Sequence, residues 1–247
     1  MGRPVLIIKT GNTVPRLRKQ GEDFEHWFCK GLGITFADTQ DSDSVIVSNV
    51  HEGEELPPLD SVGGVIITGS PAYLTDLAQW NFITAEFVRQ AHSAGIPQLG
   101  VCYGHQLIAW AFGGEVGFNP GGREIGTVPI ELSPEATIDG LFGEMPGQFY
   151  AQASHQQSVL RLPENAVLLG ANHFDAHHCF RYGECTWGVQ FHPEFDADIS
   201  RAYIEERKSD ISAEGLDPDR LLAELKDTPE SASLLRRFAE IMQQRAG

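Results

Sequence analysis

The sequence predicts an α/β fold of three layers, in which helices cover both faces of a mostly parallel β-sheet. Two observations predict it. Short apolar segments alternate with amphipathic ones along the first half of the chain, and residues 116–189 change to strand-like runs separated by Gly and Pro. The 247 residues suffice for one α/β domain with an ample core. We therefore expect a single domain over residues 1–247, with residues 196–247 as a helical C-terminal extension.

The first half of the chain is expected to supply the parallel strands and the helices between them. Each expected strand is a short apolar run, and each expected helix carries apolar residues at helical spacing. This alternation is typical of a sheet of the flavodoxin-like type. In chain order we expect strands at Pro4–Thr10, Ser44–Asn49, Val62–Thr68 and Ile96–Val101, and helices near Gly21–Leu32, Trp80–Ala94 and Gln106–Phe112.

The second half is expected to extend the sheet and then to close the chain with helices. Residues 116–189 show only weak helical periodicity, which favours antiparallel strands added at the sheet edge. Three polar helices are expected near Asp196–Lys208, Asp217–Lys226 and Pro229–Gln243. These helices either pack back on the core or dock a partner, and the sequence alone does not decide between the two.

Charge and cysteine content narrow the class of protein. The 18 Lys and Arg against 34 Asp and Glu give a net charge of −16, which argues against a nucleic-acid or membrane-binding surface. The apolar run Val5–Ile8 is too short for a secretory signal and begins a strand. We therefore expect a cytoplasmic protein whose four cysteines are reduced. The sequence His177-His178-Cys179 with Cys185 matches no standard zinc spacing, so we expect a strand, a turn and a strand there and no metal.

The sequence Gly100-Val101-Cys102-Tyr103-Gly104 places a thiol between an apolar strand and a helix. This is the context in which G-x-S-x-G forms a nucleophile elbow, with Cys in place of Ser. Glycine on both sides lets the backbone turn tightly, and the free amides at the helix start favour a thiolate. A small buried cysteine is the alternative interpretation of this segment by itself.

A second pattern, Gly188-Val189-Gln190-Phe191-His192-Pro193-Glu194, supplies an imidazole and a carboxylate after a strongly apolar strand. Residues two apart in an extended segment point to the same side, so the Glu194 carboxylate can orient His192. Together, Cys102, His192 and Glu194 have the residue types of a nucleophile, its base and the group that orients the base.

On these two motifs the chain resembles the class-I, or triad-type, glutamine amidotransferase domains, and in particular the glutaminase half of GMP synthase and its free-standing relatives. The resemblance implies that Cys102 is the nucleophile, His192 the base and Glu194 its partner. The loop Gly69-Ser70-Pro71 resembles the family's oxyanion loop, which implies backbone donors at Ser70 and at Tyr103. The family more often has Gly where this chain has Ser70.

The resemblance also implies the contacts to substrate. The segment Ala153–Val159 is similar to the family loop that holds the amino-acid end of glutamine, which assigns Gly69, Gln106, His155 and Gln156 to substrate binding. GMP synthases usually have Gly where this chain has Gln156. Without the resemblance, His155 would be interpreted as an ordinary loop histidine.

The implied activity is hydrolysis of the glutamine side-chain amide through a γ-glutamyl thioester, a half-reaction that needs no cofactor. The sequence contains no phosphate-binding loop that would activate an ammonia acceptor. Ammonia would therefore pass to an unidentified acceptor or to a synthetase subunit bound in trans. Two alternatives remain: hydrolysis of γ-glutamyl amines or peptides by the same triad, and a non-catalytic module that binds a metabolite.

Overall fold

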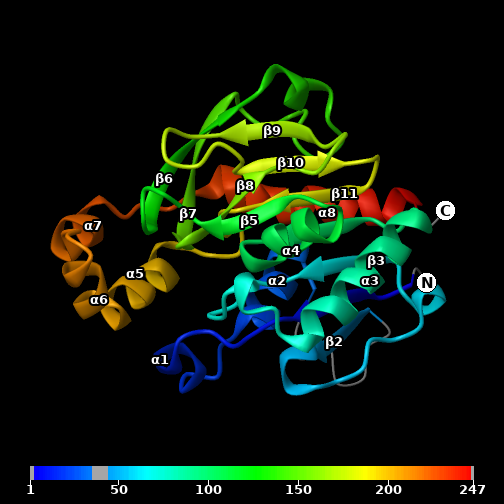
Figure 1. The fold of residues 1–247 in the computed structure, drawn as a ribbon, viewed down its shortest axis with the longest axis horizontal. Coiled ribbons are helices and arrows are strands. Elements are labelled where there is room, and N and C mark those ends of the chain that lie inside the picture. The colour runs from blue at the N-terminus through cyan, green and yellow to red at the C-terminus, as the bar shows by residue number, and fades with distance from the viewer. Residues whose placement is uncertain (1–2, 35–43, 246–247) are drawn as a thin grey trace.

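The computed structural model describes residues 3–34 and 44–245, and its main feature is a large sheet with helices on both faces (Figure 1). The strands are β1 (Val5–Lys9), β2 (Val45–Asn49), β3 (Gly64–Ile67), β4 (Gln98–Val101), β5 (Glu115–Phe118), β6 (Glu124–Leu132), β7 (Gln148–His155), β8 (Gln157–Arg161), β9 (Val167–Ala171), β10 (Cys179–Tyr182) and β11 (Thr186–Val189). The helices are α1 (Pro15–Arg18), α2 (Phe24–Leu32), α3 (Gln79–Ser93), α4 (Tyr103–Ala111), α5 (Ala197–Glu206), α6 (Lys208–Ala213), α7 (Pro218–Glu224) and α8 (Pro229–Arg245).

Within these residues the sheet has the strand order β2-β1-β3-β4-β11-β10-β9-β6-β7, and β5 pairs separately with β8. Neighbours from β2 to β11 are parallel, and those from β11 to β7 are antiparallel. The predicted α/β fold, a parallel sheet with antiparallel edge strands, is confirmed. One expectation within it was wrong: β11 lies in the segment expected to be antiparallel, yet it pairs parallel with β4. All four residues of β11 are buried, as a strand in the middle of a sheet requires.

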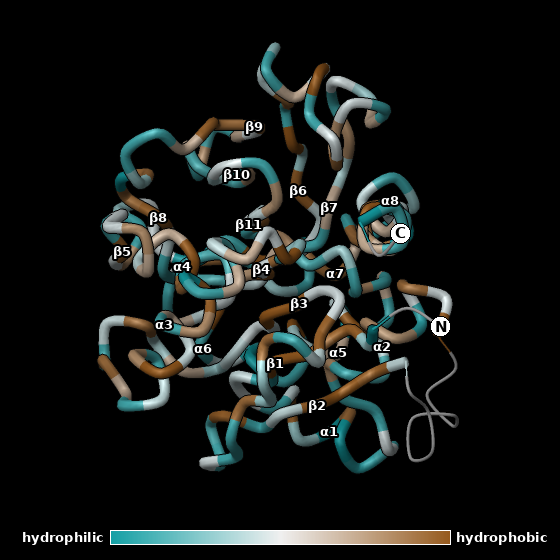
Figure 2. The backbone as a smooth tube through the Cα atoms, turned by 90° about the vertical axis from the view of Figure 1, so that its right-hand side faces the viewer, coloured by the Kyte–Doolittle hydropathy of each residue, from teal (hydrophilic) through white to brown (hydrophobic). Residues whose placement is uncertain are grey.

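The core lies on both faces of the sheet because alternate residues of each strand point to opposite sides. On β1, Val5 and Ile7 belong to the apolar cluster that contains α2 and α8, whereas Leu6 and Ile8 belong to the cluster that contains α3 and α4. Figure 2 shows hydrophobic colouring along the inner strands β1 and β3 and along the edge strand β2. Because every residue of β1 and β3 is buried, these two strands need nearly continuous apolar runs.

The C-terminal helices pack back on the core. Helix α8 lies against α2 and β7, and its residues Leu234, Leu235 and Phe238 are fully buried. A Cβ at Gly31 of α2 would lie 2.2 Å from Leu235 Cδ1, so the two helices approach more closely than a larger residue allows. Helices α5, α6 and α7 form a group at the opposite end of the molecule from both termini (Figure 1).

Differences from the sequence expectations are local. Helix α4 begins at Tyr103, directly after Cys102, rather than at Gln106. The short helices α1 and α6 were not predicted, because four to six residues carry too little periodicity to be seen. The segment containing Cys179 and Cys185 is the predicted strand, turn and strand, and all four cysteines are free. No helix in the described part of the chain is long and apolar enough to cross a bilayer.

Candidate active site

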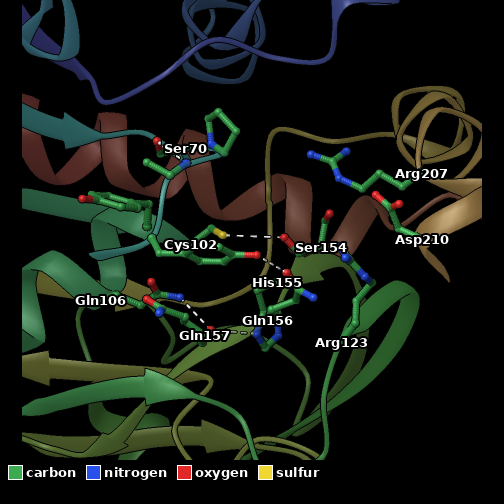
Figure 3. A pocket seen from close by; sticks show the side chains of 14 residues that line it. Ser70, Cys102, Gln106, Arg123, Ser154, His155, Gln156, Gln157, Arg207 and Asp210 are labelled. Carbon is green, nitrogen blue, oxygen red and sulfur yellow. Dashed lines mark hydrogen bonds between the residues drawn. The ribbon is translucent and has the colours of Figure 1, made fainter. Parts of the chain in front are cut away.

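Cys102 occupies a strained turn between β4 and α4. Its φ of 53° and ψ of −100° lie where residues other than Gly are rarely found, and such strain is concentrated at functional sites. The two flanking glycines are required by close packing: a Cβ at Gly100 would lie 2.4 Å from the carbonyl oxygen of Gly104, and one at Gly104 would lie 2.3 Å from that of Ile67. The predicted elbow therefore exists, and its sulfur faces a cavity (Figure 3).

His192 and Glu194 follow β11, which is hydrogen-bonded directly to β4. This pairing brings the end of β11 beside the elbow. His192 Nδ1 is 2.7 Å from Glu194 Oε1, and both side chains are buried. The imidazole is held further by stacking on Phe195, with ring centroids 4.0 Å apart. A Cβ at Gly69 would lie 2.9 Å from His192 Cε1, so this glycine makes room for the ring instead of lining the cavity.

The Cys102 thiol and the His192 imidazole shift each other's pKa values. Burial acts to raise the pKa of Cys102, but the charge of His192 and its hydrogen bond outweigh burial and hold the pKa below its ordinary value. Burial acts to lower the pKa of His192, but Glu194 and Cys102 outweigh it and raise the pKa to about 10. These two shifts both favour the pair of a Cys102 thiolate and a His192 imidazolium over the neutral pair.

The pH dependence of activity should show this pair. With rising pH, kcat/KM should increase as the Cys102 thiolate forms, because the thiolate is the nucleophile. It should then fall with an apparent pKa of about 10, as His192 loses the proton that it donates to the leaving group. Steady-state kinetics between pH 5 and pH 11 checks this expectation, and an alkaline limb near pH 6.5 would contradict it.

Two backbone amides near Cys102 are free to bind an oxyanion. The Tyr103 N–H is the first of α4 and has no acceptor within the helix. The Ser70 N–H likewise has no hydrogen-bond acceptor in the described residues, while the Ser70 hydroxyl donates to the Thr10 carbonyl at 2.7 Å and fixes the loop. Ser70 and Tyr103 both line the same cavity as Cys102. The family resemblance implies these two amides as the oxyanion donors, and that role stays a prediction.

The cavity has a volume of about 180 Å³ and a mostly polar wall (Figure 3). Cys102 and Gln106 lie on one side of it, and Arg123, Arg207 and Asp210 lie on the other. The complete lining is Ser70, Pro71, Ala72, Tyr73, Cys102, Tyr103, Gln106, Arg123, Ser154, His155, Gln156, Gln157, Arg207 and Asp210.

Three of the predicted substrate contacts line this cavity, but each already has protein partners. Gln106 Nε2 donates to the Gln157 carbonyl at 2.7 Å and to Gln190 Oε1 at 3.2 Å. Gln156 accepts from the Tyr73 hydroxyl and donates to Glu214, which places its side chain across the cavity wall. These side chains therefore shape the cavity, and their contact with substrate stays a prediction.

His155, the third predicted contact, belongs to a buried network that sequence reasoning missed. Glu124 Oε2 is 2.8 Å from His155 Nε2 and 2.9 Å from His178 Nε2, and Glu124 Oε1 accepts from Asn172. His155 Nδ1 faces the Gln157 carbonyl at 3.1 Å, so both ring nitrogens of His155 face acceptors. Burial acts to lower the pKa of His155, but Glu124 outweighs it and raises the pKa. These contacts favour the imidazolium form of His155, which can donate to Glu124 and to the Gln157 carbonyl and so links the end of β7 to the start of β8.

Glu124, His155 and His178 are also residue types that bind zinc, and their ligand atoms lie within 4.8 Å of one another. The nitrogen-to-oxygen distances of 2.8 and 2.9 Å are those of hydrogen bonds, and a carboxylate between two imidazoles accounts for them. One feature of the sequence could have indicated this buried network. Glu124 has the same parity along β6 as the buried Val128 and Ile130, so an acidic residue occupies a core-facing position.

Comparison with known proteins places the chain in a family. The sequence model of class-I glutamine amidotransferases matches residues 36–208, which is more than half of the chain. The chain therefore belongs to the class-I glutamine amidotransferase family, and the prediction made from the elbow and the His192–Glu194 pair is confirmed, including that of an enzyme of this class.

Its relatives include two kinds of protein. The chain is 34% identical over 152 residues to a subunit of the glutamine-hydrolysing GMP synthase of Methanocaldococcus jannaschii, a match that covers 61% of this chain and 74% of the relative. It is 31% identical over 144 residues to γ-glutamyl peptidase 3 of Arabidopsis thaliana, a match that covers 57% of this chain and 58% of the relative. It is 30% identical over 164 residues to a γ-glutamyl-L-1-hydroxyisopropylamide hydrolase of Pseudomonas, a match that covers 64% of this chain and 56% of the relative. The matches to these last two span less than two thirds of their length.

A solved structure supports the fold. A glutamine amidotransferase from Thermotoga maritima superposes with a TM-score of 0.73 over 98% of this chain and 99% of that chain, at 21% identity. At this identity the likeness shows the α/β fold alone.

Proposed function

We propose that the chain hydrolyses the side-chain amide of glutamine to glutamate and ammonia, through a γ-glutamyl thioester on Cys102. The observation that carries the proposal is the strained Cys102 turn, which faces a cavity beside the buried His192–Glu194 pair. Membership of the class-I family supports the same reaction. We further propose that the ammonia passes to an acceptor or to a synthetase subunit, since the Methanocaldococcus relative is itself one part of a GMP synthase. We also propose a cytoplasmic location.

In the first step the Cys102 thiolate attacks the amide carbon of the substrate. The oxygen of the tetrahedral intermediate takes up the negative charge and accepts hydrogen bonds from the amides of Ser70 and Tyr103. His192 then donates its proton to the amide nitrogen, the carbon–nitrogen bond breaks, and ammonia leaves. The glutamyl group remains on Cys102 as a thioester.

In the second step water attacks the thioester carbon. His192, now neutral, takes the proton of that water, and the carbon–sulfur bond breaks to release glutamate and to restore the thiolate. Glu194 keeps the Nδ1 proton of His192 in place throughout, so that Nε2 is the nitrogen that exchanges protons with the reactants.

Release of glutamate from three substrates by the purified chain tests the proposal: L-glutamine, γ-glutamylmethylamide and γ-glutamylglycine. We expect turnover of glutamine. Turnover of the methylamide or the dipeptide without turnover of glutamine would instead support a γ-glutamyl amine or peptide hydrolase, the function named for two of the relatives. Absence of turnover with all three would contradict both and favour a binding module.

The Glu194→Gln variant should keep measurable activity. Glutamine can still accept a hydrogen bond at its oxygen, but it cannot stabilise the His192 imidazolium by charge, so kcat/KM should fall by about 10²- to 10⁴-fold. The apparent pKa of the alkaline limb should also fall, because the charge of Glu194 raises the pKa of His192. Glu240→Gln on the exposed face of α8 is the matched control. A wild-type rate and pH profile for Glu194→Gln would show that another group orients His192.

A further inference from the structure

The cavity wall opposite Cys102 contains two arginines, Arg123 and Arg207, which differ in whether a carboxylate pairs with their charge (Figure 3). Arg123 precedes β6 and forms a two-point ion pair with Glu214, with nitrogen-to-oxygen distances of 2.7 and 2.8 Å. Its charge is therefore compensated. Arg207 stands between α5 and α6 and forms no ion pair with a described carboxylate at 4.0 Å or less.

Arg207 is held in place, yet one of its nitrogens is unused. Its guanidinium carbon lies 4.7 Å from the centre of the Tyr203 ring, and its backbone accepts from Ile211 and donates to the Tyr203 carbonyl. Its Nη1 is buried and has no hydrogen-bond partner among the described residues. Leaving a donor of a charged group buried and unpaired is costly. Because the Arg207 side chain also lines the cavity, an anionic ligand there can pair with its uncompensated charge.

We infer that Arg207 is a specificity residue that binds a carboxylate of the substrate, so that the C-terminal extension completes the pocket. This inference rests on the proposed function, in which every substrate carries the α-carboxylate of its glutamyl group. A carboxylate on the leaving group, as in a γ-glutamyl dipeptide, has the same chemistry. The planar guanidinium suits either one because it donates two parallel hydrogen bonds to a carboxylate.

Binding to the Cys102→Ala protein tests the inference without requiring turnover. Isothermal titration calorimetry of this protein with L-glutamine, γ-glutamylmethylamide and γ-glutamylglycine gives three dissociation constants. The same three constants are then measured for the double variant that also carries Arg207→Met. We expect binding to weaken by about 10- to 100-fold, the range for a hydrogen bond to a charged group. Equal weakening for all three ligands assigns the α-carboxylate, and weakening for γ-glutamylglycine alone assigns the leaving-group carboxylate.

The controls separate binding from folding. Arg201→Met removes an exposed arginine from helix α5, which directly precedes Arg207, and should leave all three constants unchanged because Arg201 does not line the cavity. Arg207→Lys keeps the charge without the planar fork and should weaken binding less than Arg207→Met, and it serves as the test if Arg207→Met does not fold. Unchanged constants for all three ligands, or no binding of any of them by Cys102→Ala, would overturn the inference. The proposed function is judged separately, by turnover in the protein that retains Cys102.

Discussion

Cys102→Ala should reduce glutamate release to the background rate, a loss of at least about 10⁵-fold, because it removes the side chain that attacks the amide and carries the thioester in the proposed mechanism. The fold should remain, because alanine fills most of the space of the buried cysteine and the flanking glycines are unchanged. Kinetics together with circular dichroism and thermal melting checks both parts. Retained turnover in a folded Cys102→Ala protein would contradict the assignment of the nucleophile.

The other cysteines provide the matched controls. Burial raises the pKa of Cys29 to about 11, and it raises those of Cys179 and Cys185 as well, whereas the pKa of Cys102 is lowered. Cys29→Ala should therefore keep wild-type turnover. Alkylation by iodoacetamide at neutral pH should modify Cys102 first, because thiolates react and thiols do not. Equal labelling of Cys29 and Cys102 in the folded protein would show that the thiolate is not stabilised at the elbow.

Glu124→Ala should lower the free energy of unfolding by about 3–5 kcal/mol, the range for removing one partner of a buried ion pair. The change leaves the His155 imidazolium without its carboxylate and leaves His178 Nε2 without an acceptor. Activity should fall as well, because this network fixes the cavity wall at Gln156 and Gln157. Urea denaturation followed by fluorescence measures the loss.

The control for this change lies on the same strand. Glu131 is exposed near the end of β6, so Glu131→Ala should change the free energy of unfolding by less than about 0.5 kcal/mol. A loss below about 1 kcal/mol for Glu124→Ala, at an unchanged denaturant slope, would show that the three buried groups are not coupled as the distances indicate.

The sequence predicted the elbow and the family because both depend on local patterns. The glycines at 100 and 104 predict a tight turn around Cys102 from the local sequence alone, and the apolar run before His192 predicts a buried strand. It did not predict that β11 would return to the middle of the sheet beside β4. That pairing depends on how the antiparallel strands between them are laid out, and no short segment encodes it.

The remaining parts of the site were missed for a similar reason. Glu124, His155 and His178 come from or adjoin three different strands and meet only in the folded core. In the sequence, Arg207 is one of many charges in a polar segment, and only the packing shows that it lines the cavity and has one buried nitrogen without a partner. Charged residues at core-facing positions are thus a signal of buried networks, while pocket residues on a terminal extension require the tertiary structure.

Trapping the acyl-enzyme tests the central claim most directly. The protein is mixed with L-glutamine or γ-glutamylmethylamide, quenched in acid within one turnover, and digested for mass spectrometry. The account predicts one added glutamyl group on the peptide that contains Cys102, absent from Cys102→Ala and lost on treatment with hydroxylamine, which cleaves thioesters. Turnover of substrate with no glutamyl group on Cys102, or with the group on another residue, would contradict it.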